Sequence, residues 1–460
     1  MSHRIEKDSL GNVNVPSRAL WGAQTQRASE NFPHLGYPMP EAMIQALALV
    51  KKAAALANTE LGGLDVALGQ SIIQACDEIL DGQHRDQFPL AVWQSGSGTQ
   101  TNMNMNEVIA NRANQLTGHP LGKKSPVHPN DHVNMSQSSN DVFPTAMHLA
   151  TLSELEQKLT PALASLRDRL EEKSKDFGDL WKVGRTHMMD AAPVTLGQEF
   201  SGYVDQIDFG LQQLELVKPN LYKLAIGGTA VGTGLNTREG WEEAVIKHLS
   251  ALSCFPLTSA RNKFTALSTH NTLLSVSSAL RQVASDFLII GSNLRMLASG
   301  PRAGLAEVIL PANEPGSSIM PGKVNPTQIE ALTMIAAEVM GNDSTVAIAA
   351  SQGHLQLNLF KPIIINNILA SIRLLAEGAV YFEKHCIKGL DCNRPQLARN
   401  LERSLMIVTA LVPRLGYDKA AEVASYALQH DLTIREVLTK KKLMPVEEFD
   451  ELIRQYVLTH

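Results

Sequence analysis

Four polar segments interrupt an otherwise helical sequence, and they hold residue types that could bind a small anion and transfer protons. The first segment, Ser95–Asn102, directly precedes a predicted helix. Hydroxyls and main-chain N–H groups at a helix N-terminus form a natural anion site. The simpler interpretation is a helix N-cap behind a flexible turn, since these residue types are also the usual caps. The segment alone does not separate the two interpretations.

A second polar segment, residues 128–141, again precedes a long predicted helix. It begins with the tetrapeptide HPND and ends with SQSSND. Asn140 or Asp141 could serve only as the helix cap. The run of hydroxyl and amide side chains before them is longer than a cap requires, which makes it a candidate binding loop.

The third segment reads GRTH at residues 184–187 and is expected to be a loop before a helix. It contains His187, whose imidazole titrates near neutral pH and could transfer protons. A single histidine in such a place is more often structural than catalytic. This segment alone therefore leaves the role of His187 open.

The fourth segment reads GSSIMPGKVNP at residues 316–326. Pro326 suits the first position of the next helix, and Asn325 suits its N-cap. Glu330 falls in the early turns, where the helix dipole favours an ionised carboxylate. A simple connection would not need an apolar Ile-Met pair between two serines and a lysine. The segment therefore predicts a mobile flap that carries chemistry.

The elements that must position these segments are mainly helical. We expect a short hairpin at 3–15, a loop at 118–142 and helices in three groups. The first group is 40–61, 68–81 and 103–117; the long helices are 143–177, 195–224, 266–299, 327–351 and 360–389; the last group is 394–404, 405–415, 418–430 and 446–457. Three successive domains follow from this pattern: 1–138, mostly helical; 139–392, the long helices; and 393–460, a small helical unit.

The long helices predict a bundle that associates with copies of itself. Apolar residues from Leu273 to Leu297 recur at alternating spacings of three and four, which is a heptad seam. A helix of about 34 residues is about 50 Å long and needs neighbours along its whole length. Small residues between Ser275 and Ala284 would allow close helix approach. One bundle alone would struggle to bring the four polar segments together.

The composition excludes several functional classes. The chain has 460 residues, a net charge of −5 and only 5% aromatic residues, so small aliphatic side chains must form the core and favour helices. The charge is not that of a nucleic-acid-binding protein. It would also not attract an anionic substrate, so a local cluster of donors must do so.

The motifs of cofactor proteins are missing from the sequence. Four cysteines, at positions 76, 254, 386 and 392, have no CxxC spacing, which argues against a disulfide framework or an iron–sulfur cluster. There is no GxGxxG, Walker A, HExxH or GxSxG motif. No secretory or transit pattern and no run of 18 apolar residues is present. We expect no cofactor, no metal, no membrane association and a cytoplasmic location.

The GSSIMPGKVNP segment resembles the signature of the fumarase/aspartase superfamily, and the resemblance extends over the chain in the order of its loops. The GRTH and SSND segments resemble fumarases, whereas aspartases typically carry glutamine at position 187 and SxTND at the other segment. The resemblance implies a mainly all-α, three-domain fold with a central five-helix bundle. It also implies reversible hydration of fumarate to L-malate through an aci-carboxylate intermediate.

The resemblance also implies a set of site residues. Ser317 would be the base that takes the carbon proton, His187 the acid acting through water, and Glu330 the residue that orients His187. The implied substrate-binding residues are Ser97, Gly98, Thr99, Ser138, Ser139, Asn140, Thr186, Ser318, Lys323, Val324 and Asn325. His128, Pro129, Asn130 and Asp131 resemble a second, peripheral acid site. The implied assembly is a homotetramer with each site drawn from three chains.

Three alternatives remain at this stage. An aspartase would add ammonia rather than water to the same double bond. A structural protein is the second, because lens crystallins arose within the superfamily, although all five residues expected to act in the chemistry are present here. A purely scaffolding bundle is the third, and the polar segments argue against it.

Overall fold

Two antiparallel strands, β1 (His3–Asp8) and β2 (Gly11–Pro16), form the predicted N-terminal hairpin in the computed structural model, which describes residues 2–458. The rest of the described chain is mainly helical, which confirms the predicted fold class. Its other strands form only two-stranded pairs. The chain folds into two compact units, each built from separated segments.

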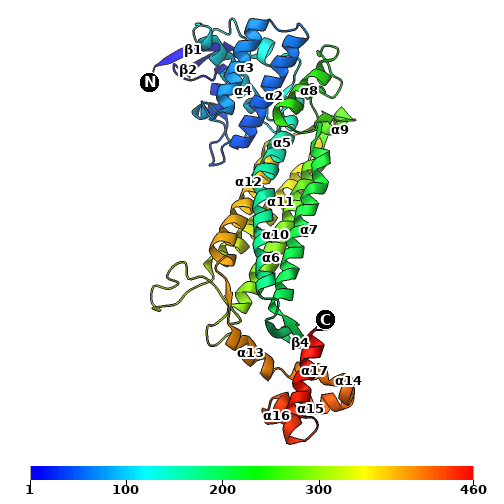
Figure 1. The fold of residues 1–460 in the computed structure, drawn as a ribbon. Coiled ribbons are helices and arrows are strands. Elements are labelled where there is room, and N and C mark those ends of the chain that lie inside the picture. Colours follow the sequence, from blue (N-terminus) through cyan, green and yellow to red (C-terminus); the bar gives the residue numbers. More distant parts are fainter. Residues whose placement is uncertain (1, 459–460) are drawn as a thin grey trace. The chain divides into compact units, whose positions relative to one another are not determined.

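Unit 1 comprises Met1–Pro161, Gln212–Ala284 and Ala337–Ala376. Its central helix is α2, which packs against α3, α4, α5 and α8 (Figure 1). The alanines of α2 let these neighbours approach closely. The elements are α1 (Ala23–Asn31), α2 (Glu41–Glu60), α3 (Val66–Leu80), α4 (Thr99–Leu116), α5 (Ser139–Glu154), α8 (Trp241–Ser253), α9 (Lys263–Ser268), β5 (Lys223–Leu224), β6 (Thr258–Ser259), β8 (Gly353–His354) and β9 (Leu357–Asn358).

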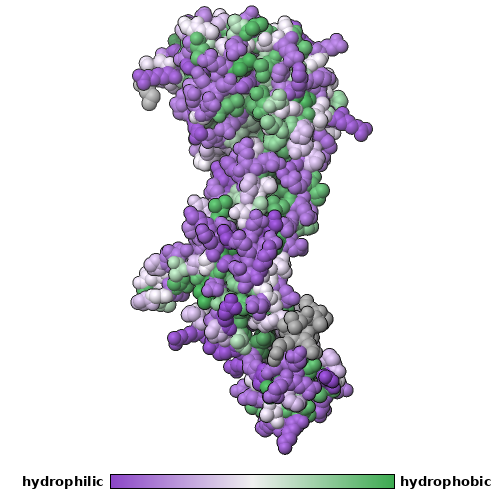
Figure 2. Space-filling model, viewed as in Figure 1, coloured by the Kyte–Doolittle hydropathy of each residue, from purple (hydrophilic) through white to green (hydrophobic). Residues whose placement is uncertain are grey.

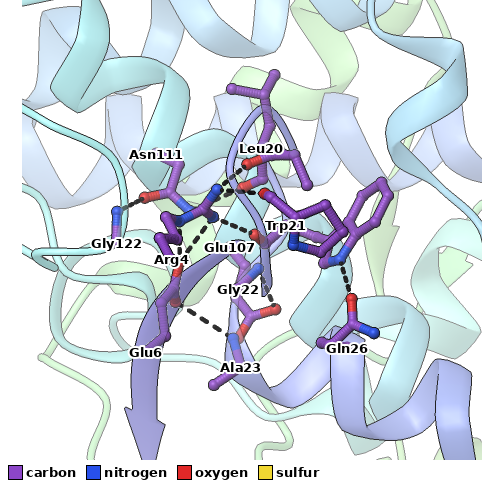
Figure 3. Close-up of polar contacts among 12 residues, drawn as sticks. Arg4, Glu6, Leu20, Trp21, Gly22, Ala23, Gln26, Glu107, Asn111 and Gly122 are labelled. Atoms are coloured by element: carbon purple, nitrogen blue, oxygen red, sulfur yellow. Dashed lines mark hydrogen bonds and ion pairs between the residues drawn. The ribbon is translucent and has the colours of Figure 1, made fainter. Parts of the chain in front are cut away.

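A buried carboxylate joins the start of α1 to α4. Glu107 on α4 accepts a hydrogen bond from the main-chain N–H of Gly22 at 2.9 Å (Figure 3). It also accepts from the N–H groups of Gln24 and Thr25 at 2.9 and 3.0 Å. Arg4 on β1 donates to the carbonyl of Trp21 at 2.7 Å and thereby ties the hairpin to the same segment. These bonds fix the N-terminal region against the helix that carries the first polar segment.

Unit 2 comprises Ala162–Leu211, Ser285–Ala336 and Glu377–His460. It contains a second hairpin and a small helical region with its own apolar core. The hairpin packs against α13 and the 3-10 helix Leu405–Leu411. The elements are β3 (Trp181–Thr186), β4 (Met189–Thr195), β7 (Val308–Ile309), β10 (Asp391–Cys392), α13 (Arg394–Arg403), α14 (Val412–Leu415), α15 (Tyr417–His430), α16 (Ile434–Lys440) and α17 (Val446–Leu458).

The predicted long helices are present, and segments of them occur in both units. In unit 1, Ser277 on α10 donates to Asp343 on α11 at 2.7 Å. In unit 2, Arg167 on α6 lies 3.4 Å from Asp208 on α7. The helices are α6 (Thr160–Asp176), α7 (Leu196–Leu221), α10 (Asn271–Leu297), α11 (Thr327–Ala350) and α12 (Lys361–Phe382).

Some predicted boundaries are wrong. The expected helix 266–299 is two helices, because Thr269 takes an extended conformation between α9 and α10. The helix expected at 143–177 begins earlier, at Ser139, and continues through a π-turn at Leu155–Leu159 into α6. The two structural units do not test the division into three successive domains, which stays a prediction.

Two helices, Asn271–Leu297 and Lys361–Ile387, are long and apolar enough to cross a membrane by length and composition alone. Just over half of each most apolar window is buried within the chain, at 56% and 61%. The core helix of a helical bundle meets the same criteria, so this finding agrees with the bundle.

Candidate active site

The first polar segment folds as a tight turn at the N-terminus of α4 in unit 1. The Ser97 hydroxyl lies 2.9 Å from that of Thr99, which is the first residue of the helix. Gly98 has a φ of +76°, and a Cβ atom there would overlap the ring of Phe143. The turn therefore requires glycine at this position and places both hydroxyls at the helix N-terminus.

The second polar segment begins α5, and part of it is indeed a cap. The Ser138 hydroxyl accepts from the main-chain N–H of Asn140 at 3.2 Å, and Asp141 accepts from the N–H of Ser138 at 2.9 Å. The side chain of Asn140 does not cap the helix, because its amide donates to the carbonyl of Ala230 at 2.7 Å. The N-cap is therefore Ser138 rather than Asn140 or Asp141, and Asp141 takes part as the third helical residue of the capping box.

The two segments come together within unit 1. Asn102, three residues into α4, donates to the Ser139 hydroxyl at 2.9 Å and to Asn134 at 3.2 Å. Asp141 is buried beneath them and also accepts from the N–H groups of Gly227 and Thr229 at 3.1 and 2.9 Å. Burial raises the pKa of Asp141 to about 6. The amide of Asn102 in the first segment and the hydroxyl of Ser139 in the second are thus joined above a buried carboxylate.

Two buried lysines adjoin these loops, and the sequence prediction missed both. Lys51 on α2 donates to Asn134 and to Gln137, each at 2.9 Å. Lys361, the first residue of α12, donates its main-chain N–H to the carbonyl of Gly96 at 3.0 Å. Lys51 had a signal in the sequence, because it falls on the apolar stripe of its helix with Leu47 and Ala54.

The third segment is a strand and a hairpin turn, which corrects the expectation of a loop before a helix. Thr186 ends β3, and His187 and Met188 form the two-residue turn to β4 with φ values of +56° and +65°. Two positive φ angles in a two-residue turn suit the right-handed twist of a hairpin. The turn places the exposed side chain of His187 at the tip.

The hairpin borders a cavity in unit 2. This cavity has a volume of about 580 Å³ and is lined by residues that include Arg185, Thr186, Met188 and Asn293. Arg185 pairs with the fully buried carboxylate of Glu307. The strand that leads to His187 is therefore anchored by buried charges.

The fourth segment is an exposed loop that is closed at its base. Gly316 donates its N–H to the carbonyl of Lys323 at 2.8 Å, and the Asn325 amide donates to the carbonyl of Gly316 at 2.6 Å. Asn325 therefore does not cap α11 as predicted; the carbonyl of Pro326 accepts the first helical bonds. The Ser317 hydroxyl accepts N–H groups from Ile319 and Met320 at 3.2 and 3.0 Å.

Some pairs of residues that were predicted to act together are not in contact in the described structure. Within residues 2–458, no hydrogen bond or ion pair connects His187 with Glu330, or Lys323 with Ser317. Thr186, Ser318, Lys323, Val324 and Glu330 are exposed. The first two segments lie in unit 1 and the other two in unit 2. The roles inferred for these residues therefore stay predictions.

The predicted second acid site forms one turn of π-helix at Pro129–Val133 in unit 1. The ring Nδ1 of His128 accepts the N–H groups of Asn130 and Asp131 at 3.2 and 3.1 Å. Burial lowers the pKa of His128. Three residues after Asp131, Asn134 contacts Lys51, so this turn is continuous with the network under the second segment.

Comparison with known proteins gives a consistent result along the chain. A family described as Lyase matches residues 11–341, and one described as Fumarase C C-terminus matches residues 407–460. Fumarate hydratase class II of Pseudomonas syringae pv. tomato is 56% identical over 98% of this chain and 97% of its own. The mitochondrial fumarate hydratase of Rhizopus oryzae is 50% identical over 98% of this chain and 92% of its own. The crystal structure of class II fumarase from Schistosoma mansoni superposes with a TM-score of 0.94 and 42% identity, covering 98% of both chains.

Proposed function

The chain belongs to the class II fumarate hydratase family, and from this premise we propose that it adds water reversibly across fumarate to give L-malate. Such a reaction makes it a hydro-lyase of the citric acid cycle. The observation that carries the proposal within the structure is the junction of the two hydroxyl-rich loops through Asn102 and Ser139. Hydroxyls and main-chain N–H groups at helix N-termini can bind a small acid.

The chemistry requires a base, an acid and donors for a developing dianion. Elimination moves charge from the carbon next to a carboxylate into that carboxylate, and fixed donors stabilise it. Ser317 is proposed as the base. Its hydroxyl already accepts two N–H groups, and such donors would stabilise the alkoxide that a serine base needs. Lys323 and Asn325 are proposed to stabilise the aci-carboxylate.

His187 is proposed as the acid, acting through water, with Glu330 orienting its ring. Ser97, Thr99, Ser138, Ser139 and Asn140 of unit 1 would bind the substrate, as would Thr186 and Ser318 of unit 2. His128–Asp131 would form a peripheral acid site. Each of these roles matches the family pattern and awaits its own test.

We further propose a homotetramer whose sites combine residues of different copies. His187 and Glu330 have no contact within the described part of one chain, so a second copy would have to bring them together. Apolar side chains lie exposed at the hairpin turn and on the flap, where Met188 is 69% and Ile319 84% exposed. Others lie along the long helices: Leu216, Met334 and Ile348. Figure 2 shows apolar patches among the hydrophilic surface of the face in view.

A cytoplasmic location belongs to the same proposal. All four cysteines are free thiols, as in a reducing compartment. The relative from Rhizopus oryzae is named a mitochondrial enzyme, so location varies among relatives.

An aspartate ammonia-lyase is not favoured, because the relatives of 50–56% identity are named fumarate hydratases. The direct test compares purified protein on L-malate and on L-aspartate by the ultraviolet absorbance of fumarate. We expect fumarate from malate only. Fumarate from aspartate, with none from malate, would reverse the assignment.

A complementation experiment tests the shared site. His187→Asn and Ser317→Ala proteins, each inactive alone, are denatured together in equal amounts and refolded. If the two residues of one site come from different copies, about a quarter of the sites in randomly mixed closed oligomers receive both intact residues. Activity should return to that fraction. Mixed tetramers that are confirmed by mass but stay inactive would place both residues on one chain.

A further inference from the structure

Two lysines of unit 1 are completely buried without a carboxylate partner. Lys51 and Lys361 are each 0% exposed, and neither has an acidic side chain within ion-pair distance among the described residues. Lys218 of the same unit is also buried, but it forms ion pairs with Glu156 and Glu215. The first two lysines therefore differ from Lys218 in having no carboxylate within ion-pair distance among the described residues.

This arrangement is costly for the fold. An ammonium that leaves water without an opposite charge loses several kilocalories per mole of solvation. Burial lowers the pKa of Lys51 and of Lys361 to about 7. A buried ammonium without an ion-pair partner therefore does not by itself stabilise the fold. Their presence therefore calls for a role other than stability.

Lys51 lies behind the second polar loop. Its ammonium donates to Asn134 and Gln137, and Gln137 directly precedes Ser138. Asn134 in turn accepts from Asn102, whose amide donates to the Ser139 hydroxyl. Two side chains thus separate the ammonium from a hydroxyl proposed to bind the substrate. The charged neighbour of Lys51 is Asp141, whose carboxylate is already held by three N–H groups.

Lys361 lies behind the first polar loop. Its ammonium donates to the carbonyl of Asn358 at 2.6 Å, and its N–H donates to the carbonyl of Gly96. A Cβ atom on Gly96 would stand 1.4 Å from the carbonyl oxygen of Leu359, so the loop presses directly on this segment. The neighbouring His270 is neutral, because burial lowers its pKa well below its usual value.

We propose that Lys51 and Lys361 are positioning residues whose charges attract and hold the dianionic substrate through the two loops they support. The proposal rests on the proposed function. The two polar loops contain no lysine or arginine of their own. Under the proposal, Lys51 and Lys361 supply the positive charge near these loops that attracts an anionic substrate to a protein of net negative charge. In this arrangement, the dianion supplies the compensating negative charge only when it is bound.

The test compares the binding of two unreactive ligands, succinate and butyrate, to the full-length protein by calorimetry. These ligands are of similar size, but succinate carries two negative charges and butyrate carries one. Lys51→Met and Lys361→Met should each weaken succinate binding about tenfold, as expected for a charge several ångströms from the ligand. Butyrate binding should weaken only about threefold, because a monoanion feels about half the energy. Lys51→Arg and Lys361→Arg, which keep the charge, should retain most of the difference between succinate and butyrate affinity seen in the wild type.

Lys218→Met is the matched control, since it removes a buried lysine that has its own carboxylates. It should lower the melting temperature and leave the binding of both ligands unchanged. If Lys51→Met and Lys361→Met weaken both ligands equally, or weaken neither, the electrostatic role is wrong. If a Met variant does not fold, the Arg variant decides: equal affinity for the two ligands would overturn the proposal. Wild-type protein that neither binds succinate nor hydrates fumarate would instead refute the proposed function.

Discussion

Arg185, which lies two residues before His187, forms a bidentate ion pair with Glu307. The two nitrogen–oxygen distances are 3.0 and 2.6 Å. Lys182 on the same strand lies 3.3 Å from this carboxylate, and Asn400 on α13 donates to it at 3.0 Å. Burial by itself would raise the pKa of Glu307, but the bond from Arg185 and the charge of Lys182 lower it below its usual value. The carboxylate thus fixes the strand that presents His187.

Glu307→Gln should impair turnover more than substrate binding. The change removes the carboxylate shared by the half-buried Arg185 and the buried Lys182, which keeps Glu199, and breaking a fully buried pair costs about 3–5 kcal/mol. We expect a lower melting temperature and a kcat reduced about tenfold or more, with a smaller change in KM, because His187 loses its fixed position. Steady-state kinetics and thermal unfolding check both effects.

Glu383→Gln is the control for this prediction. It breaks the pair between Arg169 and Glu383, which is also in unit 2 but more exposed and does not contact the hairpin. It should leave kcat nearly unchanged. Equal kcat values for the two variants would show that Glu307 does not position His187.

Gly96→Ala should disrupt the first polar loop. The added methyl group would meet the main chain of Leu359, which cannot move as a flexible side chain does. We expect a large loss of stability or of substrate affinity, measured by thermal unfolding and by KM. Gly62→Ala is the control, because its site is open and only its φ of +66° opposes the change, at roughly 1 kcal/mol. Equal tolerance of the two variants would contradict the close approach.

His148 should make the protein less stable in mild acid. Burial lowers its pKa from the ordinary 6.5 to about 4, and its Nδ1 lies 3.0 Å from the carbonyl of Leu221. The unfolded chain therefore binds a proton between these two values while the folded chain does not, so stability falls as pH falls through this window. Urea unfolding midpoints of wild type and His148→Gln, followed between pH 7 and 4, should show a shallower decline in the variant. Parallel curves would exclude this contribution.

Chelation should leave the activity intact. Residues 2–458 contain no group of three or more histidine, cysteine or acidic side chains that could hold a metal ion. Dialysis against EDTA should therefore not change turnover of L-malate. Activity that disappears and then returns with a divalent metal would contradict the prediction of a metal-free enzyme.

The helical framework could be predicted because its signals are local. The seam from Leu273 to Leu297 and the turn at Ser9-Leu10 each determine one element. The hairpin at 181–195 could not be predicted, since His187 and Met188 occupy a turn where glycine or asparagine is the usual signal. The break between α9 and α10 could not be predicted either, because no proline or glycine marks it in the sequence.

The positions of the polar loops could be predicted where their residues lie in continuous motifs. The polar loops of unit 1 come together as hydroxyl-rich helix starts, and the flap is an exposed loop. Lys51 and Glu307 were missed because a single charged residue in a helix or a loop looks like surface sequence. The position of Lys51 on the apolar stripe of its helix was a signal for its burial, whereas the burial of Glu307 and the contacts of both residues appear only in the tertiary fold.

The carboxylate of Glu107 also affects the order in which the chain can fold. Its main-chain donors at Gly22 and Thr25 are synthesised 85 and 82 residues before it. At roughly 5–20 residues per second, the start of α1 would wait on the order of ten seconds on the ribosome for its cap. A helix of nine residues is too short to persist alone. The N-terminal segment must therefore leave the ribosome unfolded and be fixed in place only after α4 has been made.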